Sequence, residues 1–484
     1  MSSTATALRR GVTSFVIILP LVAMWSLATP LGAAFDENEH FLRAASIVRG
    51  QFRPPTVRTA VGLQSLVRVR TDLATVAVAA KCTAFHANVP ASCESSPSSS
   101  HRLVVVVDAA GRYPPLYYLL VGWPTLFTHG REAMWSVRLL SVLLVTLLLA
   151  IAHAILRSEQ DAMLGFAVAL TPTCLFLGGI VNPSSVEIAA AFVVWVGMLH
   201  IAQDGPSRPV VWLTAAGAGA LILTRPLGPL MLAGVLAAVA LRMGVGRARV
   251  LVADMRMRPA ATVVASALLV QAAWLLFAGP PHLTALGKHH GSTFAAMVSI
   301  LKVEGVQVQS MVARFGWGET HAHGLTFLAW AAGSIILLVA FARRAHGMDA
   351  AQAVALVATI IAIQLTFDLI NFRTLGFFWN GRYSLPLVVG VPLLMSRKTG
   401  PLSAASIGSA RVALAIGHVT AFLWTLDRYA FGGLAERHLV WQPPGGVWLT
   451  SFGFIAAISI YFATASRSSH SDALIRPSKA LLGP

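Results

Sequence analysis

Three acidic side chains lie within four consecutive positions of the sequence, at Asp36, Glu37 and Glu39, and His40 follows directly. The whole chain of 484 residues contains only 19 Asp and Glu residues, so this concentration is unusual. On a helix, Asp36 and Glu37 precede His40 by four and three residues, which places the three side chains on one face. A carboxylate in such a group can act as a general base and remove the proton of an attacking hydroxyl group.

The same segment also suits an ordinary helix start. Asp36 fits the N-cap position, and Glu39 fits the third helical position of a capping box. Glu39 and Arg43 are four residues apart, which is the spacing of a routine ion pair on a helix surface. The residues alone leave a structural role and a catalytic base open as alternatives, so the elements around them must decide.

The chain that carries these residues has the composition of an integral membrane protein. Hydrophobic residues make up 56% of it and charged residues 11%, with a mean hydropathy of +0.71, whereas soluble domains carry roughly 25% charged residues. In lipid, backbone polar groups must bond to one another, so only helices or closed barrels can span it. The apolar runs are about 20 residues long, which fits helices, since barrel strands alternate over about 10 residues. We expect an all-α polytopic membrane protein with one transmembrane domain over residues 1–484.

The hydropathy pattern predicts about twelve transmembrane helices. The candidate spans are 12–31, 133–156, 162–181, 186–203, 209–224, 226–243, 260–279, 325–342, 350–371, 383–396, 403–426 and 447–465. The first run is longer than the 7–15-residue core of a signal peptide, so we interpret it as an uncleaved span. With the N-terminus in the cytoplasm, nearly every short loop on that side is basic, as the positive-inside rule requires. Both termini, including the tail 466–484, are therefore predicted to be cytoplasmic, and the net charge of +17 reflects topology, not nucleic-acid binding.

Most residues that could do chemistry fall on the extracytoplasmic side. Two external loops are large: 32–132, which holds the acidic segment and is expected to carry juxtamembrane helices, and 280–324. The aromatic segment 113–127 is short for a span, and counting it as one would invert every later loop. We therefore expect it to form a helix in the outer interface of the bilayer.

Cysteine and histidine residues leave two further questions open. Cys82 and Cys93 share the first external loop, where a disulfide and two free thiols fit the sequence equally, and Cys174 lies in an apolar segment where we expect it to be buried. The cysteine spacing is no zinc signature, and no cofactor is predicted. A divalent metal in the second loop is the less favoured alternative to solvated histidines. The histidines concerned are His282, His289, His290, His321 and His323.

Four motifs occur in order along the chain: Phe35–Phe41, Tyr113–Tyr118, Thr224–Pro226 and Gly381–Pro386. The first resembles the Pro-Asp-Glu-Pro-x-His-Phe motif of a bacterial membrane-protein family named domain of unknown function 2142 (DUF2142), within the GT-C superfamily of glycosyltransferases. The second is similar to the superfamily's His-Pro-Pro-Leu juxtamembrane helix. The last two resemble the family's Lys/Arg-Pro corner and its Gly-Arg-Tyr-x-Leu-Pro entry to a late span.

This resemblance implies a GT-C-like helix bundle in the plasma membrane of a bacterial cell. It implies inverting transfer of a sugar from a polyprenyl-phosphate donor to a glycan or lipid acceptor of the cell envelope. Asp36 is then the catalytic base, and Glu37 either orients or replaces it. Arg225 and Arg382 would stabilise the departing phosphate, although both could instead extend towards lipid headgroups.

For the remaining site residues, the expected role is substrate binding. His40 would position a carboxylate or bind sugar hydroxyls, and Tyr383 belongs to the late motif. Tyr113 and Trp317 could stack on a sugar, although external aromatic residues also anchor proteins at the interface. The turn Phe315–Glu319 is a further candidate for substrate contact.

Two departures from the family pattern limit these implications. The acidic motif lacks both prolines, and Ser184 and Ser185, followed by Glu187, stand where the family often has an Asp. This puts in doubt a role for a second carboxylate or a metal. A membrane transporter or lipid flippase is an alternative function, although Asp368 is almost the only acid well within a predicted span and no convincing repeat is present. A non-catalytic scaffold for envelope assembly is another.

Overall fold

The long apolar runs of the sequence form helices in the computed structural model, which describes residues 3–156, 160–281, 292–377, 379–399, 402–432 and 438–473. The helices of the bundle are α1 (Ser3–Ala28), α5 (Gly130–Ile155), α6 (Gln160–Ala169), α7 (Pro172–Gly178), α8 (Pro183–Asp204), α9 (Arg208–Thr224), α10 (Gly228–Met243), α11 (Val245–Ala253), α12 (Arg258–Ala278), α13 (Thr293–Lys302), α14 (Glu304–Val312), α15 (Gly324–Ala342), α16 (Gly347–Leu375), α17 (Leu385–Val388), α18 (Gly390–Met395), α19 (Ala404–Phe431) and α20 (Gly446–Ala473). This arrangement confirms the predicted helical membrane-protein class.

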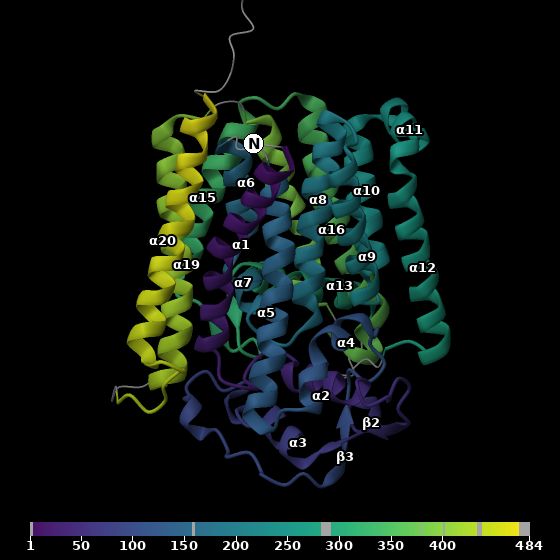
Figure 1. The fold of residues 1–484 in the computed structure, drawn as a ribbon, viewed down its shortest axis with the longest axis vertical. Coiled ribbons are helices and arrows are strands. Elements are labelled where there is room, and N and C mark those ends of the chain that lie inside the picture. Colours follow the sequence, from purple (N-terminus) through teal and green to yellow (C-terminus); the bar gives the residue numbers. More distant parts are fainter. Residues whose placement is uncertain are drawn as a thin grey trace, which may run out of the picture.

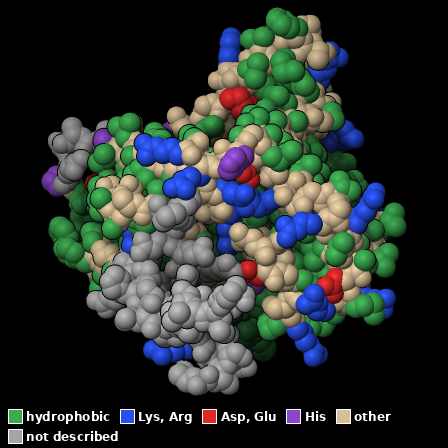
Figure 2. All heavy atoms as spheres, turned by 90° about the horizontal axis from the view of Figure 1, so that it is seen from above, with side chains coloured by type: hydrophobic (Ala, Val, Ile, Leu, Met, Phe, Trp, Pro, Cys, Tyr) green, Lys and Arg blue, Asp and Glu red, His purple; other side chains and the backbone are tan. Residues whose placement is uncertain are grey.

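The two ends of the bundle differ in character (Figure 1). α1 begins and α20 ends at one end, at the top of the view, whereas residues 32–132 cover the opposite end with short elements. Figure 2 looks down on the first end, where Lys and Arg side chains are spread widely and acidic side chains are few. The positive-inside pattern assigns such a basic end to the cytoplasm. The orientation of the chain in a membrane stays a prediction.

The number of membrane crossings also stays a prediction. Within the described residues, eight helices are long and apolar enough to span a membrane, or nine if the pair α10 and α11, bent by 117°, counts as one span. The predicted span 162–181 is divided between α6 and α7, because Pro172 cannot continue a helix and Thr171 caps the new one. The predicted span 383–396 is likewise divided among the 3-10 turn η5 (Gly381–Ser384), α17 and α18.

The first large loop contains a small sheet that an all-α description omits. Its elements are α2 (Glu37–Ile47), β1 (Thr56–Thr59), β2 (Gly62–Arg70), α3 (Thr71–Ala77), η1 (Lys81–Thr83), η2 (Ala91–Cys93), β3 (Leu103–Asp108), α4 (Leu116–Gly122) and η3 (Trp123–Leu126). The three strands are antiparallel in the order β1-β2-β3, and Leu66 lies opposite Val107. A second, two-stranded hairpin of β4 (Arg314–Phe315) and β5 (Thr320–His321) lies between α14 and α15.

The aromatic segment 113–127 forms α4 and η3, which together are too short to span a bilayer. These elements lie at the loop end of the bundle, and α4 packs against α2. Trp123 and Phe127 are exposed. Exposed aromatic side chains at this level suit the membrane interface, where we expect this segment to lie.

The helices pack around buried aromatic rings and close helix contacts. Trp25 of α1 lies 4.8–6.1 Å from the rings of Phe176, Phe315, Phe422 and Phe454, which come from four other elements. α8 is the most enclosed of the span-length helices, since 83% of its apolar window is buried, against 17% for the helix that contains α12. α12 is therefore an outer helix whose apolar surface faces away from the bundle (Figure 1).

A disulfide joins Cys82 to Cys93, which resolves the choice that the sequence left open, and Cys174 is buried as expected. A disulfide stabilises mainly by limiting the freedom of the unfolded chain, and a short loop contributes about 2–3 kcal/mol. We expect Cys82→Ser to lower the thermal midpoint of the purified protein and to speed proteolysis between the two positions. Cys174→Ala, which removes only a free thiol, should not produce that cleavage. Equal cleavage in both variants would contradict a structural role for the bond.

Candidate functional site

Asp36 lies at the turn between α1 and α2, and its carboxylate faces away from the helix that it precedes. Its backbone is left-handed, with φ 53° and ψ 12°, and its side chain makes no capping hydrogen bond. The capping box with Glu39, one of the two alternatives that the sequence left open, is therefore not formed. The Asp36 Oδ2 atom instead accepts a hydrogen bond from Nη2 of Arg382 at 2.5 Å. The side chain remains 39% exposed, so the carboxylate is open to a ligand.

Two arginines from distant parts of the chain meet beside this carboxylate. The guanidinium carbon of Arg225 lies 4.6 Å from the ring centre of Tyr383, and that of Arg382 lies 5.3 Å from it. Arg382 also lies over Phe35, at 4.2 Å. Arg225 follows α9 and Arg382 lies in η5, so both are helix-end residues, as the sequence predicted. One aromatic ring thus holds two positive charges next to Asp36.

These guanidinium groups retain unused donors. Among the described residues, Nε and Nη1 of Arg382 and Nε of Arg225 are buried and have no hydrogen-bond partner. Nη1 of Arg225 donates to Oγ of Ser184 and Oε2 of Glu187, both at 3.1 Å. Buried N–H groups are normally paired, so several unpaired donors at one place indicate that an acceptor-rich ligand completes their hydrogen bonds. An anion such as a phosphate supplies acceptors of that kind.

The other wall of the site is built from neutral groups. Nδ1 of His40 lies 2.9 Å from the Tyr118 hydroxyl group, and its ring meets that of Tyr113 edge to face at 5.5 Å. Burial lowers the pKa of His40 to about 3, against the opposing effect of Asp36. Tyr113 is hydrogen-bonded to Arg225, and burial raises the pKa of its hydroxyl group. His40 and Tyr113 are therefore uncharged at neutral pH.

The charge balance favours the ionised form of Asp36. Burial is the largest single influence and acts to raise the pKa of this carboxyl group, but the charge and hydrogen bond of Arg382 together with the charge of Arg225 outweigh it. The net pKa of Asp36 is lower than its ordinary value of 3.8. Asp36 is thus a carboxylate at physiological pH, paired with a guanidinium in the free protein.

Glu37 lies on the other side of the turn and does not reach the open face. Its two oxygens accept hydrogen bonds from Nε and Nη2 of Arg138 on α5, both at 2.7 Å. Both side chains are 0% exposed. The backbone N–H groups of Gly32 and Val181 also donate to it, each at 3.0 Å. Gly32 has φ +80°, and a Cβ there would lie 2.5 Å from the Ala77 carbonyl oxygen, so this turn requires glycine. The remaining donors of Arg138 go to the carbonyl oxygens of Ser26, Thr29 and Pro30.

Glu39 does not form the expected ion pair with Arg43. Oε2 of Glu39 accepts from the Ala109 N–H at 2.7 Å, and its side chain is hydrogen-bonded to Asp108. Burial and the neighbouring Glu39 raise the pKa of Asp108 well above its ordinary value. Arg43 instead donates to backbone carbonyl groups, including that of Gln51 at 2.8 Å. These contacts attach α2 to the end of β3.

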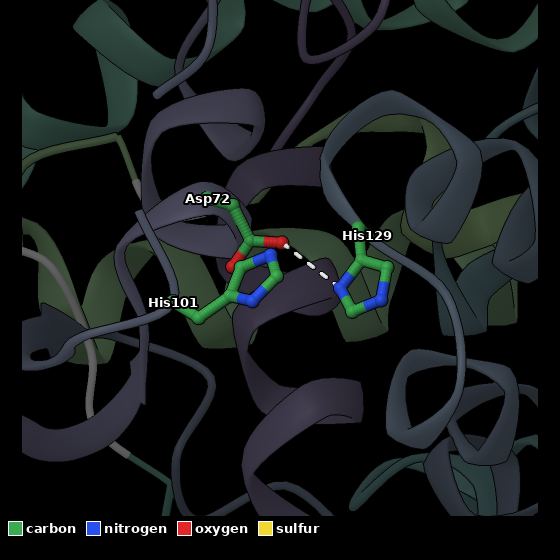
Figure 3. A group of neighbouring side chains, drawn as sticks. All are labelled: Asp72, His101 and His129. Atoms are coloured by element: carbon green, nitrogen blue, oxygen red, sulfur yellow. Dashed lines mark ion pairs between the residues drawn. The ribbon is translucent and has the colours of Figure 1, made fainter. Parts of the chain in front are cut away.

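One group of side chains in the described residues has the spacing of metal ligands: Asp72, His101 and His129, with ligand atoms within 4.8 Å of one another (Figure 3). Arg70 donates to both Asp72 oxygens, at 2.9 and 3.0 Å, and the two imidazole rings stack at 4.5 Å. Because a guanidinium already neutralises the carboxylate, we assign no metal to this group. Of the histidines considered from sequence, His282, His289 and His290 lie outside the described residues. His321 is exposed, and His323 caps α15.

An apolar groove of about 440 Å³ is lined by residues that are close in sequence to two site residues. Its residues come from α4, the end of α9 and α12, and they include Pro115 and Leu223, which are two residues from Tyr113 and Arg225 respectively. The full lining is Pro115, Leu116, Leu119, Leu223, Val270, Gln271, Ala273, Trp274 and Phe277. The groove lies against the outer helix α12 and suits a hydrocarbon chain.

The structure brings six of the seven predicted site residues together. The six share contacts around the Tyr383 ring and the Asp36 carboxylate, and they are Asp36, His40, Tyr113, Arg225, Arg382 and Tyr383. Glu37 lies behind them in its pair with Arg138. Sequence reasoning missed Arg138, although an arginine within a predicted span is itself a signal that an acidic partner must be near.

Comparisons with known proteins agree with the motifs. A family model described as a predicted membrane protein, DUF2142, matches residues 19–391, which include all seven predicted site residues. No curated protein matches the chain. Among solved structures, the crystal structure of ArnT from Cupriavidus metallidurans bound to undecaprenyl phosphate is similar at 14% identity and a TM-score of 0.45, covering 98% of this chain and 78% of that one. The family match spans most of the sequence, so the chain belongs to the DUF2142 family of predicted membrane proteins.

Proposed function

We propose that this protein is an inverting glycosyltransferase that uses a polyprenyl-phosphate sugar as donor and works at the end of the bundle covered by residues 32–132. The observation that carries the proposal is the meeting of Asp36 with two buried arginines on the Tyr383 ring. A base, an anion site and an adjoining apolar groove are what a lipid-phosphate donor and a hydroxyl acceptor require.

The arginines act on the leaving group. As the bond between the anomeric carbon and the phosphate oxygen breaks, negative charge grows on the polyprenyl phosphate. The unpaired donors of Arg382 and Arg225 supply charge-assisted hydrogen bonds to these oxygens. The prenyl chain lies in the apolar groove between α4 and α12, whose lining residues Pro115 and Leu223 are two positions along the chain from Tyr113 and Arg225.

Asp36 acts on the acceptor. Its carboxylate takes the proton of the acceptor hydroxyl group while the hydroxyl oxygen forms the new bond to the anomeric carbon. The phosphate leaves from the opposite face of the sugar, so the configuration at that carbon inverts. His40, which is neutral, binds hydroxyl groups by hydrogen bonding and adds no charge that would compete with the arginines.

Arg382 is paired with Asp36 in the free protein and with phosphate oxygens as well in the donor complex. Its hydrogen bond to Asp36 keeps the pKa of that carboxylate low, which makes Asp36 a weak base before the donor binds. When phosphate oxygens share the guanidinium, its effect on Asp36 weakens and the carboxylate becomes more basic. Glu37, whose oxygens are already occupied, has a structural part in this proposal: it fixes the turn that presents Asp36.

The direct test is transfer by the purified protein in lipid nanodiscs, supplied with radiolabelled polyprenyl-phosphate sugars and with oligosaccharide or lipid acceptors. We expect one donor to give labelled product and free polyprenyl phosphate in equal amounts. Movement of a lipid substrate across a vesicle membrane without product would favour a transporter or flippase. Full complementation of a gene deletion by the Asp36→Ala/Glu37→Ala double variant would favour a scaffold.

Removal of the Arg382 charge should lower the catalytic efficiency of the protein with its donor substrate. We expect Arg382→Gln to lower kcat/KM for the donor by roughly 10²–10³-fold, the loss typical when one donor to transition-state charge is removed. Undecaprenyl phosphate binding, measured by native mass spectrometry or displacement, should weaken in parallel. Arg373→Gln is the matched control, because Arg373 is exposed on the last turn of α16. Equal donor kinetics for both variants would exclude Arg382 from phosphate binding.

A further inference from the structure

One carboxylate organises two segments that the proposed reaction does not yet use. Oε2 of Glu319 accepts hydrogen bonds from the backbone N–H groups of Trp317, at 2.8 Å, and of Phe85, at 3.3 Å. Its Oε1 atom accepts a hydrogen bond from Nη2 of Arg428 at 3.2 Å. The same Arg428 nitrogen donates to the carbonyl oxygens of Thr83 and His86. The disulfide-closed loop 82–93 is thereby held against the turn Phe315–Glu319.

The two side chains brought together in this way are aromatic and form a pair. The ring centres of Phe85 and Trp317 lie 5.7 Å apart, and the Phe85 side chain is 71% exposed. Phe85 has φ 63°, a left-handed conformation that is rare for a bulky residue. An exposed ring gains little from burial, so the packing of the protein does not explain why a phenylalanine is held in this way.

The indole of Trp317 is half-buried beneath the exposed Phe85 ring. Its Nε1 atom is buried and has no hydrogen-bond partner among the described residues, so the surface that the pair offers to a ligand is aromatic. An exposed aromatic ring suits a ligand with a flat C–H face. A pyranose ring has that chemistry.

The pair adjoins the proposed reaction site through a direct backbone contact. The carbonyl oxygen of Gly316 accepts a hydrogen bond from the N–H of Phe35 at 2.9 Å, and Phe35 precedes Asp36. Gly316 has φ +65°, and a Cβ there would lie 2.0 Å from Oε1 of Glu319, so the turn can approach this carboxylate only with glycine. Phe35 also carries the Arg382 guanidinium on its ring.

We propose that Phe85 and Trp317 form a platform on which a pyranose ring of the acceptor stacks while its hydroxyl group reaches Asp36. This inference rests on the proposed glycosyltransferase function and specifies its acceptor as a glycan. The exposed ring of Phe85 binds the C–H face of the sugar, and the indole of Trp317, tilted by 56° against it, borders the edge of the bound sugar. Glu319 and Arg428 hold the platform in place without touching the sugar.

The test measures sugar binding and donor binding separately, in nanodiscs. The probes are trisaccharides of glucose, mannose, galactose, arabinose and N-acetylglucosamine for the platform, and undecaprenyl phosphate for the arginine site. We expect one trisaccharide to quench tryptophan fluorescence in the native protein and not in Trp317→Phe. Phe85→Ala should weaken that binding roughly three- to tenfold, as loss of one aromatic contact does, while undecaprenyl phosphate binding stays unchanged.

The matched control is Trp448→Ala, because Trp448 and Phe452 form an exposed stacked pair on another element, α20. Unchanged sugar affinity in Phe85→Ala and Trp317→Phe, or absence of binding by every trisaccharide, would overturn the platform. Quenching of Trp317 by brominated lipids without quenching by sugars would also overturn it and assign the pair to membrane anchoring. Loss of undecaprenyl phosphate binding in the native protein would instead count against the proposed function itself.

Discussion

Asp36→Asn is expected to reduce sugar transfer by roughly 10²–10⁴-fold, which is the usual contribution of a general base. The substitution keeps the size of the side chain, and its carbonyl oxygen can still accept the hydrogen bond from Arg382. An amide cannot take a proton from the acceptor hydroxyl group. The fold should be preserved, because the Asp36 side chain makes no capping bond and is partly exposed.

A measurement of donor binding distinguishes loss of the base in Asp36→Asn from loss of the folded site. Asp36→Asn removes a negative charge beside Arg382 and should therefore bind undecaprenyl phosphate at least as tightly as the native protein. Asp254→Asn is a suitable control, because Asp254 lies in the loop between α11 and α12 and pairs with the nearby, exposed Arg256. Normal turnover by Asp36→Asn would remove Asp36 as the base and leave the arginine site to be explained otherwise.

The pH dependence of kcat/KM tests whether Arg382 controls the pKa of Asp36. The pKa of Asp36 is lowered because the neighbouring arginines, chiefly Arg382, together outweigh the effect of burial, so Asp36 stays ionised into the acid range. The kcat/KM of the native protein should therefore not fall through protonation of Asp36 at any pH above about 5. In Arg382→Gln the effect of burial dominates, the pKa of Asp36 rises, and the acid limb should move to higher pH. Superimposable profiles for the two proteins would contradict the coupling.

Much of the site could be foreseen because its residues belong to short local motifs. Asp36, Arg225 and Arg382 each lie next to a proline corner or a helix end, and their helix-end placement follows from hydropathy alone. The meeting of Arg225 and Arg382 on the Tyr383 ring could only be expected from the family resemblance. Sequence spacing carries no information about contacts between residues 157 positions apart along the chain.

The remaining features depend on long-range contacts that compete with local preferences. Asp36 has the right residue type for an N-cap, but Arg382, on a distant element, engages its carboxylate. Glu39 has the right spacing for Arg43, yet the end of β3 offers it a backbone N–H and a second carboxyl group. Proline breaks divided two predicted spans that hydropathy treats as continuous. In each case the interaction or helix expected from neighbouring residues is absent, because a residue far along the sequence or a backbone restriction favours another arrangement.

Glu37→Gln is expected to lower the free energy of unfolding by about 3–5 kcal/mol, because it leaves the Arg138 charge buried without a counter-ion. The thermal midpoint in detergent should fall markedly, and the double variant Glu37→Gln/Arg138→Gln should recover part of the loss, since it removes both charges. Asp254→Asn, which weakens a pair with the exposed Arg256, should leave the midpoint nearly unchanged. At a temperature where Glu37→Gln remains folded, transfer should persist, because Glu37 holds the turn and does not take the proton. An unchanged midpoint with abolished transfer would reverse this assignment and make Glu37 the catalytic carboxylate.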